Sequence, residues 1–397
     1  MIEGKSILMI GWYKPQVGGG SHVVQNIVNK LKEKNKVYVL NVEERGYSTG
    51  LGHWNDNGVK VYQEKLLYPY RYTTLQTMFQ TTKRALLLRK KIDLYHAHGP
   101  FFSGIGFLDQ KKPLVLTIHG YSSLESVSHG RIKPNSPHFK FMRCVEKQAV
   151  GRADAVIAVD KRIYEWIINE LNGYPKKVFH IPNGVDTKKF CPDLNGSKIR
   201  SKYHLENKPV ILFVKALSPK NGPEVAIKVM KEIIKVYPEA TLLIVGDGPL
   251  RSRLLNLTKE LKLEKNIIFC GMKSNDEVPY YYAASDIVVV PSIHIADVEE
   301  ATSITMLEGM ASGKPVVASN IGGLKEIING SDNTIGVLFG EGDYKDMAEK
   351  VINLLDNKSV RIEIEKNARE YIESKHTWEK IVEEISKVYQ YALDVHT

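Results

Sequence analysis

Short apolar runs alternate along this chain with longer segments in which apolar residues recur every three or four positions. The first run, residues 6–13, is followed by residues 21–35, where Val24, Ile27 and Leu31 fall at helical spacing. Further strand-like runs lie at residues 36–42, 93–99, 113–120 and 155–160. Runs with near-continuous Val, Ile and Leu are typical of parallel strands buried on both faces. The pattern therefore predicts alternating strands and helices around a parallel sheet.

The alternation breaks between residues 182 and 208, a stretch rich in Pro, Gly, Asn and charge that we interpret as a linker. It then restarts, with strand-like runs at residues 210–217, 241–248, 266–271, 286–292, 314–319 and 336–339, and ends in helical sequence. A chain of 397 residues suits two domains. We predict an α/β protein with two doubly wound, Rossmann-like domains, residues 1–190 and 209–375. Ligands of such sheets bind at the carboxyl ends of strands, which predicts a site in a cleft between the domains.

Composition narrows the class of protein. Charged residues make up 25% and hydrophobic residues 43%, as in folded globular proteins, and no apolar run approaches the roughly 20 residues of a membrane helix. The three cysteines have no C-x-x-C spacing, which disfavours a disulfide framework or a zinc site and fits the cytoplasm. The net charge of +10 favours anionic partners, namely nucleic acid, anionic lipid or phosphorylated small molecules, or reflects only a lysine-rich surface.

The basic segment TKRALLLRKK, residues 82–91, allows two interpretations. It could be a helix that touches a membrane surface. It could equally be the end of a helix whose cations complement the helix dipole before the next strand. We favour the second interpretation.

Candidate binding groups follow the predicted strands of the first half. Three glycines, residues 18–20, lie between the first strand and the first helix, where backbone can approach a ligand and the helix N-terminus favours an anion. An ordinary turn is the alternative. His98 and His119 each end a strand, so their side chains are predicted to face the cleft. His119, followed by Gly120, is the better candidate, and His96 is interpreted as a structural residue.

In the second half, Lys215 and Lys220 follow the first predicted strand. They could hold phosphate as point charges, or could be solvated surface residues. The next strand ends in the glycine-containing segment GDGP, residues 246–249, which predicts a further loop at the cleft.

Two glutamates, Glu300 and Glu308, bracket the predicted start of a helix near residues 301–303. Free N–H groups of residues such as Ser303 and Ile304 would lie between them and suit a diphosphate. Eight residues of helix rise about 12 Å, which is the scale needed to hold a ribose at one end and a sugar at the other. The pair is therefore a candidate clamp for a nucleotide-sugar. The alternative is an acid that stabilises the helix start and a chance glutamate.

Taken together, these motifs resemble those of glycosyltransferase family 4, retaining enzymes of the GT-B fold. The resemblance covers nearly the whole chain and rests on segments that occur in the same order. They are Gly19-Gly20-Ser21-His22, His98-Gly99, TIHG (117–120), IPNGVD (181–186), GDGP, DIVVVPS (286–292), the E-x7-E of Glu300 and Glu308, and GKPVVASNIGGLKEII (313–328). The segment HTWEKIVEEISKVY, residues 376–389, resembles the last helix of the family, which crosses back onto the N-terminal domain. The resemblance thus assigns residues 376–397 to the first domain.

The resemblance implies roles for residues of the second half. Glu300 would contact the donor sugar and Glu308 the ribose. Backbone near Ser303 and Ile304 would bind phosphate, and residues around Met272 would hold the base.

For the first half, the resemblance implies that His119 lies near the reacting sugar. The loop at Gly19 and Gly20 would lie close to the donor phosphate and the acceptor. Residues 44–80 and 121–142 are predicted as loops that line the acceptor side.

The chain departs from the family at one loop. Members typically carry an Arg and a Lys there as a diphosphate clamp. Alignment on Gly222 puts Ala216 and Asn221 at these positions, whereas a shift of one residue puts Lys215 and Lys220 there. Either the lysines substitute or the clamp is partly missing. The chain has no D-x-D triplet, in keeping with transfer that needs no metal.

We therefore predict a cytoplasmic glycosyltransferase of carbohydrate biosynthesis that retains configuration and uses no metal or cofactor. Its donor substrate would be a nucleotide-sugar, of UDP type, and its acceptor a glycan, a lipid-linked sugar or a small molecule. Contact with an anionic membrane is left open, and nucleic acid is not an expected partner. One alternative is a degenerate member that binds donor or glycan with little turnover. Another is a dinucleotide-dependent oxidoreductase, which the absent G-x-G-x-x-G disfavours.

Overall fold

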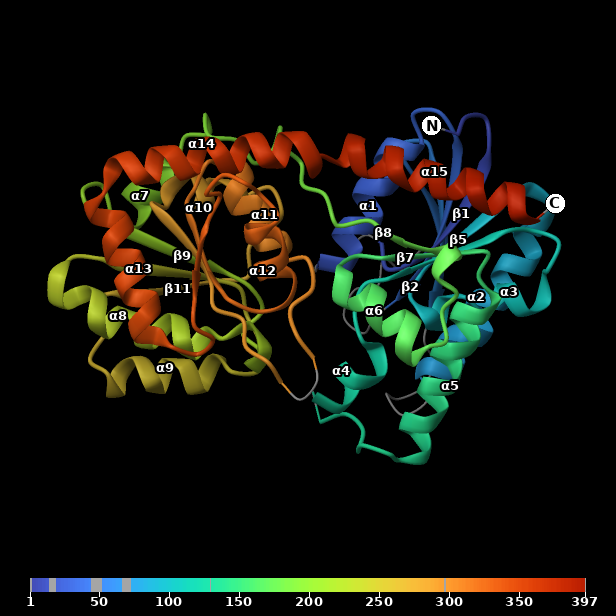
Figure 1. Ribbon diagram of the computed structural model, residues 1–397, viewed down its shortest axis with the longest axis horizontal. Coiled ribbons are helices and arrows are strands. Elements are labelled where there is room, and N and C mark those ends of the chain that lie inside the picture. Colours follow the sequence, from blue (N-terminus) through green and yellow to red (C-terminus); the bar gives the residue numbers. More distant parts are fainter. Residues whose placement is uncertain are drawn as a thin grey trace. The chain divides into compact units, whose positions relative to one another are not determined.

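The computed structural model describes residues 2–13, 19–43, 52–65, 73–128, 130–295 and 298–396 (Figure 1). The chain forms two compact units, each with its own sheet. Unit 1 consists of Met1–Asn183 and Trp378–Thr397, and unit 2 consists of Gly184–Thr377. Unit 2 is therefore inserted between two segments of unit 1. This is the architecture of two parallel-sheet α/β domains that the strand–helix alternation predicts.

Unit 1 is built on an eight-stranded sheet with the order β3-β4-β2-β1-β5-β6-β7-β8. Its strands are β1 (Ser6–Gly11), β2 (Lys36–Glu43), β3 (His53–Asp56), β4 (Val59–Lys65), β5 (Leu94–His98), β6 (Leu114–Ile118), β7 (Ala155–Ala158) and β8 (Val178–His180). Neighbouring strands are parallel except for β3 and β4. The chain moves outward from β1 through β2 in one direction and from β5 to β8 in the other. The switch point of this sheet therefore lies between β1 and β5.

The helices of unit 1 are α1 (Gly19–Leu31), α2 (Thr73–Leu88), α3 (Ile105–Leu108), α4 (Ser122–Ser128), α5 (Pro137–Arg152), α6 (Lys161–Glu170) and α15 (Trp378–His396), with short 3-10 turns η2 (Arg89–Lys91), η3 (Pro100–Phe102) and η4 (Pro175–Lys177). Helix α15 packs beside α1 and against β6 and β7 (Figure 1). A buried hydrogen bond of 2.6 Å joins the Tyr389 hydroxyl on α15 to Nδ1 of His96 on β5. The C-terminal helix thus belongs to unit 1, as the resemblance implies.

Among the described residues, the prediction of loops at residues 44–80 and 121–142 is wrong for much of both segments. Residues 44–51 and 66–72 lie outside the described residues. Strands β3 and β4 form an antiparallel hairpin whose turn residues Asn57 and Gly58 have φ of 50° and 90°. Two successive residues with positive φ are what a tight hairpin turn requires, and Asn-Gly is the dipeptide that supplies them most readily. Helix α2 then begins at Thr73, and α4 and α5 occupy most of the second segment.

Unit 2 is built on a six-stranded parallel sheet with the order β11-β10-β9-β12-β13-β14. Its strands are β9 (Val210–Val214), β10 (Thr241–Val245), β11 (Ile267–Gly271), β12 (Ile287–Val290), β13 (Val316–Ser319) and β14 (Val337–Phe339). Its helices are α7 (Ser197–Tyr203), η5 (Pro219–Asn221), α8 (Pro223–Val236), α9 (Arg251–Glu260), α10 (Val278–Ala284), α11 (Ile304–Ala311), α12 (Gly322–Asn329), α13 (Tyr344–Asp356) and α14 (Lys358–Lys375). The switch point lies between β9 and β12, which are neighbours in the sheet.

The core of unit 2 follows from the alternation of side chains along each strand. Val210 and Leu212 of β9 face one side, where they pack with residues of α10, α11, α12 and α14. Ile211 and Phe213 face the other side and pack with residues of α8, α9 and α13. Because both faces are covered, each strand needs an unbroken apolar run, which is what the sequence contains.

The prediction of a linker between residues 182 and 208 is wrong. Residues from Gly184 onward belong to unit 2, and the segment contains α7. Phe190 and Leu205 are buried in the same core cluster as β9 and α11. The Arg369 guanidinium of α14 also donates to the backbone oxygen of Phe190 at 2.8 Å. The stretch resembles a linker in composition, but a few apolar anchors bind it to unit 2.

Candidate active site

The switch point of unit 2 brings together a lysine and a glutamate that lie far apart in the sequence. Lys215 directly follows β9, and its Nζ donates to Oε1 of Glu300 at 2.6 Å and to Oγ of Ser292 at 3.0 Å. Only 8% of the Lys215 side chain and 12% of the Glu300 side chain is exposed. The two predicted site residues thus form a buried ion pair at the carboxyl ends of β9 and β12.

The charges around Glu300 keep it ionised. Burial raises its pKa, but the charges of Lys215 and Lys220 act in the opposite direction and leave the pKa below its ordinary value. For Lys215, burial has the larger effect, because it lowers the pKa more than the charge of Glu300 raises it. A charged acceptor is therefore present at this position at neutral pH, together with two cations.

The backbone of Glu300 is held by the start of α12. The N–H of Gly323 donates to the carbonyl oxygen of Glu300 at 2.9 Å. Gly322 has φ of +46°, and a Cβ at this position would collide with the same carbonyl oxygen. Only glycine allows both this backbone conformation and this close approach. The Gly-Gly pair of the segment NIGG therefore fixes the loop that carries Glu300.

Glu300 lies outside helix α11, which corrects the predicted helical span between the two glutamates. The helix begins at Ile304, and Ser303 before it has extended backbone with φ of −75° and ψ of 112°. Only residues 304–308 of the span are helical, and these rise about 6 Å. Glu308 is consequently little more than one turn inside the helix. The predicted helix start near residues 301–303 is correct to within one residue.

The N-terminus of α11 is arranged for an anion. Leu307 donates the first helical hydrogen bond to the Ser303 carbonyl at 3.2 Å, so the N–H groups of Ile304, Thr305 and Met306 precede the helical ladder. The Thr305 hydroxyl donates to the Val214 carbonyl at 2.7 Å and ties the helix to the end of β9. The Ser303 hydroxyl is buried beside Glu300 and helps to lower the pKa of that carboxyl. These donors suit a phosphate group.

Glu308 has a partner that sequence reasoning did not find. The Tyr282 hydroxyl on α10 donates to Oε2 of Glu308 at 2.9 Å and lies 3.2 Å from the Thr305 carbonyl. Burial raises the pKa of Glu308 to about 7, although the Tyr282 hydrogen bond and the charge of Lys189 lower it. No local signal in the sequence links residues 26 positions apart on different helices.

The loop between β9 and α8 contains the residues at which the chain departs from the family pattern. Asn221 Nδ2 donates to the Ala216 carbonyl at 2.8 Å and to the Ser218 hydroxyl at 3.1 Å, so this amide closes its own loop. Lys220 is partly buried, and its carbonyl accepts from the Ile293 N–H at 2.9 Å. The cations of this loop are therefore Lys215 and Lys220, both close enough to Glu300 to lower its pKa.

The residue predicted near the base lies on another strand. Met272 directly follows β11, which is separated from β9 by β10. Its side chain is 56% exposed. The structure thus places Met272 at the same edge of the sheet as Lys215, two strands away.

In unit 1, the predicted histidines form a stack at the ends of β5 and β6. His98 Nδ1 and His119 Nε2 are 3.0 Å apart, and their rings are stacked with centroids separated by 5.3 Å. His96 bonds on both sides, to Tyr389 at 2.6 Å and to the Thr117 hydroxyl at 2.7 Å, in agreement with a structural role. The second nitrogen of His98, Nε2, is buried without a partner among the described residues.

Burial keeps all three histidines neutral. It lowers the pKa of His96 to about 3 and of His119 to about 4, and it lowers the pKa of His98 well below the ordinary value. A neutral pair shares one proton in its hydrogen bond, so one ring donates. Since buried N–H groups without a partner are rarer than buried acceptors without one, the favoured tautomer has His98 Nδ1 donating to His119 Nε2. His119 then carries its own proton on Nδ1, where it can be donated to a ligand.

The glycine loop before α1 is only partly described. Gly19 and Gly20 form the first residues of α1, and a Cβ on Gly20 would touch the ring of Trp12. Residues 14–18 lie outside the described residues. The prediction of phosphate contact at Gly19 and Gly20 therefore stays a prediction.

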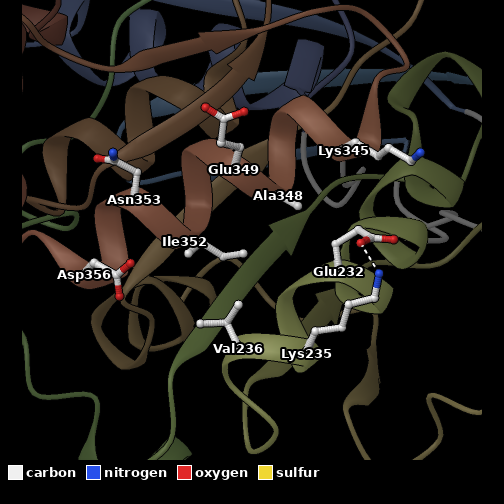
Figure 2. Close-up of a pocket in the computed structure, with 9 residues that line it drawn as sticks. All are labelled: Glu232, Lys235, Val236, Lys345, Ala348, Glu349, Ile352, Asn353 and Asp356. Atoms are coloured by element: carbon white, nitrogen blue, oxygen red, sulfur yellow. Dashed lines mark hydrogen bonds and ion pairs between the residues drawn. The ribbon is translucent and has the colours of Figure 1, made fainter.

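A surface groove in unit 2 lies away from the predicted residues. Figure 2 shows it between the end of α8 and the length of α13, where Glu232 and Lys235 form an ion pair of 2.5 Å. None of the predicted site residues lines the groove. It therefore adds nothing to the candidate site.

The described part of the chain contains neither a metal-binding cluster nor a membrane-spanning helix. No group of three or more His, Cys, Asp and Glu side chains is arranged to hold a metal ion among the described residues. None of the described helices is both long enough and apolar enough to cross a membrane.

Two family models match the chain. "Glycosyl transferases group 1" matches residues 196–371, and "Glycosyltransferase Family 4" matches residues 17–189. An uncharacterized glycosyltransferase of Methanocaldococcus jannaschii is 30% identical over 98% of this chain and 99% of its own. The UDP-Gal:alpha-D-GlcNAc-diphosphoundecaprenol alpha-1,3-galactosyltransferase of Escherichia coli is 28% identical over 77% of this chain and 76% of its own.

Among solved structures, Anabaena HepE in complex with UDP is similar, with a TM-score of 0.76 and 20% identity over 97% of this chain and 99% of that one. The two sheets and these matches define a glycosyltransferase of the GT-B fold, which transfers a sugar from a nucleotide-sugar. The chain belongs to the group 1/family 4 glycosyltransferases, as its motifs led us to expect.

Proposed function

We propose that this glycosyltransferase uses a UDP-type nucleotide-sugar, retains the configuration of the transferred sugar and needs no metal ion. One arrangement carries the proposal, namely the N-terminus of α11 between the Lys215–Glu300 ion pair and Glu308. The UDP specificity is supported by the names of the Escherichia coli relative and the HepE complex.

The leaving diphosphate gains negative charge as the bond to the sugar breaks. Fixed dipoles and cations that already point at this charge stabilise the transition state without reorganisation. The N–H groups of Ile304 and Thr305 and the ammonium of Lys220 supply this environment in unit 2. They perform the task for which other transferases use a metal ion, and so support metal-independent transfer.

Glu300 acts as an acceptor for hydroxyls of the donor sugar in this proposal. Its ion pair with Lys215 lowers its pKa and hence its basicity, which makes it a poor covalent nucleophile. Positive charge develops on the sugar ring as the leaving group departs, and a nearby carboxylate stabilises it. Lys215 thus acts as a positioning residue, while Lys220 faces the diphosphate.

Glu308 is proposed to accept hydrogen bonds from the ribose hydroxyls. A carboxylate is a pure acceptor with several lone pairs, which suits vicinal hydroxyls. The Tyr282 hydroxyl already occupies one oxygen, Oε2, and so orients the group. In unit 1, His119 is proposed to donate from Nδ1 to the reacting sugar, with His98 fixing this tautomer.

We propose a lipid-linked sugar as the acceptor, used in the cytoplasm at an anionic membrane surface. The Escherichia coli relative is named for an acceptor carried on diphosphoundecaprenol. The net charge of +10, which favours anionic partners, is the second support. A glycan or a small molecule remains the competing acceptor class.

A second candidate function is binding of nucleotide-sugar with little turnover. It is favoured by the loop after β9, where Asn221 closes the loop and Lys215 is engaged by Glu300. Donor affinity would then be present while the clamp on the leaving diphosphate is weak.

A thermal-shift screen of UDP-, GDP- and ADP-sugars, followed by assay of nucleotide release with and without a chelator, tests both functions. A ligand at about 100 times its Kd should add about 2.7 kcal/mol of stability. We expect stabilisation by UDP-sugars, release of UDP that the chelator does not reduce, and a product with the anomeric configuration of the donor. Binding without release would favour the second function, and loss of release with the chelator would contradict metal independence.

A further inference from the structure

Three large apolar side chains point out of unit 1 on two neighbouring helices. Phe79 and Leu87 of α2 and Leu108 at the end of α3 are 70%, 69% and 62% exposed, the highest fractions of any large hydrophobic residue in the described part of the chain. Phe79 and Leu87 are eight positions apart and so share one side of α2. Helices α2 and α3 lie side by side (Figure 1). Exposed apolar residues on neighbouring helices indicate a surface that binds a protein, a ligand or a membrane.

Basic residues lie on the same segments as these side chains. They are Lys83, Arg89, Lys90, Lys91, Lys111 and Lys112. Lys83 lies midway between Phe79 and Leu87 on the same side of α2. The other basic residues directly precede β5 and β6, which are adjacent parallel strands, so they gather at the amino edge of the sheet. We name the three apolar and six basic residues together the α2–α3 surface.

Carboxylates are almost missing from these segments. Residues 73–92 contain no Asp or Glu, and residues 100–112 contain only Asp109. Asp109 is 7% exposed and accepts a hydrogen bond of 2.8 Å from the Tyr95 hydroxyl. None of the six basic residues forms a salt bridge with a residue that the structure describes. The α2–α3 surface is therefore both apolar and strongly cationic.

We propose that the α2–α3 surface docks onto an anionic lipid bilayer. Apolar side chains that project between basic ones match the boundary between acyl chains and anionic headgroups. Long lysine side chains can bury their stems there while the ammonium groups reach the phosphates. Exposed leucines have no partner of this kind in nucleic acid, which is recognised by cations and aromatic stacking.

The structure thereby changes the preference between the two interpretations of residues 82–91. The end of α2 at Leu88 and the cations of η2 do complement the helix dipole. That role does not account for Leu87 and Leu108, which project from the same surface. The inference rests on the membrane contact proposed above, but it does not depend on the transfer reaction.

Sedimentation of the full chain with vesicles tests the inference. Vesicles of phosphatidylcholine alone are compared with vesicles that also contain phosphatidylglycerol. We expect binding to the anionic vesicles only, weakened by salt because exposed charges are screened. Equal binding to both kinds of vesicle, or to neither, would overturn the proposal.

Two sets of substitutions locate the contact. The change of Lys83, Lys90 and Lys91 to Ala should lower the partition coefficient on anionic vesicles by on the order of a hundredfold. The change of Phe79 and Leu87 to Ser should lower it by at least about tenfold, because their apolar area no longer leaves water.

Matched controls come from unit 2. Leu255 and Ile362 are exposed apolar residues, and Lys259 and Lys265 are exposed lysines. Their changes to Ser and Ala should leave vesicle binding unchanged. All variants should keep the thermal shift with nucleotide-sugar, which separates failure of this inference from failure of the proposed function.

Two further outcomes would overturn the proposal. One is vesicle binding by the lysine and apolar variants equal to that of the wild type. The other is a wild-type dimer in solution that these variants convert to monomer, since a second copy would then cover the surface.

Discussion

If Glu308 binds the ribose as proposed, its raised pKa makes nucleotide binding dependent on pH. Burial raises this pKa from 4.5 to about 7. Only the ionised carboxylate is a pure acceptor for the ribose hydroxyls, so binding should favour this form. Affinity should therefore rise as the pH rises through 7, and binding below pH 7 should release a proton.

The magnitude follows from the position of the pKa. If only the ionised form binds, the apparent affinity at pH 8 should exceed that at pH 6 by about tenfold. Stability shows the opposite trend. Below the unfolded pKa, Glu308 is protonated in the folded and the unfolded state and does not affect stability. Above the folded pKa, it lowers the free energy of unfolding by about 3 kcal/mol, because the folded state must ionise a buried group.

Three proteins separate this effect from other titrations. Glu308→Gln should lose the pH dependence and bind more weakly by about 1.5–3 kcal/mol, because one charged acceptor is lost. Tyr282→Phe removes the hydroxyl that donates to Oε2, so the pKa of Glu308 should rise further and the affinity profile should move to higher pH. Wild type is the reference.

Isothermal titration with the nucleotide-sugar selected by the thermal-shift screen is the assay. A nucleotide-sugar is preferable to a free nucleoside diphosphate, whose terminal phosphate itself titrates near a pKa of about 6. Heats measured in buffers of different ionisation enthalpy report proton release. A pH dependence that is the same in wild type and Glu308→Gln would refute the assignment of Glu308 to the ribose.

Three further predictions concern the two units separately. Lys215→Met should destabilise unit 2 by about 3–5 kcal/mol, because it leaves Glu300 buried without its lysine partner. In urea unfolding, the double variant that also carries Glu300→Gln should regain most of this stability, and additive losses would contradict the ion pair. Gly322→Ala should abolish nucleotide-sugar binding, because it displaces the loop that carries Glu300. Gly342 also has positive φ but has no neighbour within 4 Å, so Gly342→Ala should bind normally. Equal binding by both variants would contradict the role of Gly322. His96, His98 and His119 of unit 1 have lowered pKa values, so the unfolded state takes up protons first, and stability should fall below about pH 6.5 by up to about 4 kcal/mol per pH unit. All four tryptophans belong to unit 1, so fluorescence-detected urea unfolding at pH 7, 6 and 5 measures this, and an unchanged midpoint would contradict it.

Most of the described strands were predictable because burial on both faces leaves a local signature, whereas β3, β4 and β8 lay outside the predicted runs. Every apolar run assigned to a strand contains one, and the helix start near Ser303 followed from the small polar residues before an apolar segment. The hairpin at Asn57 and Gly58 also had a local signal, which the prediction of a loop overlooked. The misassigned linker shows the limit of composition, because Phe190 is buried by residues that are distant in sequence.

The hydrogen bonds and the ion pair within the candidate site could not have been predicted from the sequence. Lys215 and Glu300 lie 85 positions apart, and they meet because the sheet places β9 beside β12. Tyr282 reaches Glu308 only because α10 and α11 pack together. Local spacing identified the glutamates as candidates, but their ionisation depends on neighbours that only the fold supplies.

The insertion of unit 2 between two segments of unit 1 has a consequence for synthesis on the ribosome. Residues 184–377 form an uninterrupted stretch and can fold as soon as they have emerged. The first 183 residues must wait for α15, which is made after unit 2 and supplies Val382, Val388 and Tyr389 to the interior of unit 1. Until then, the surface that α15 covers stays open to misassociation and to chaperones. Unit 1 therefore completes its folding after unit 2, although most of unit 1 is synthesised first.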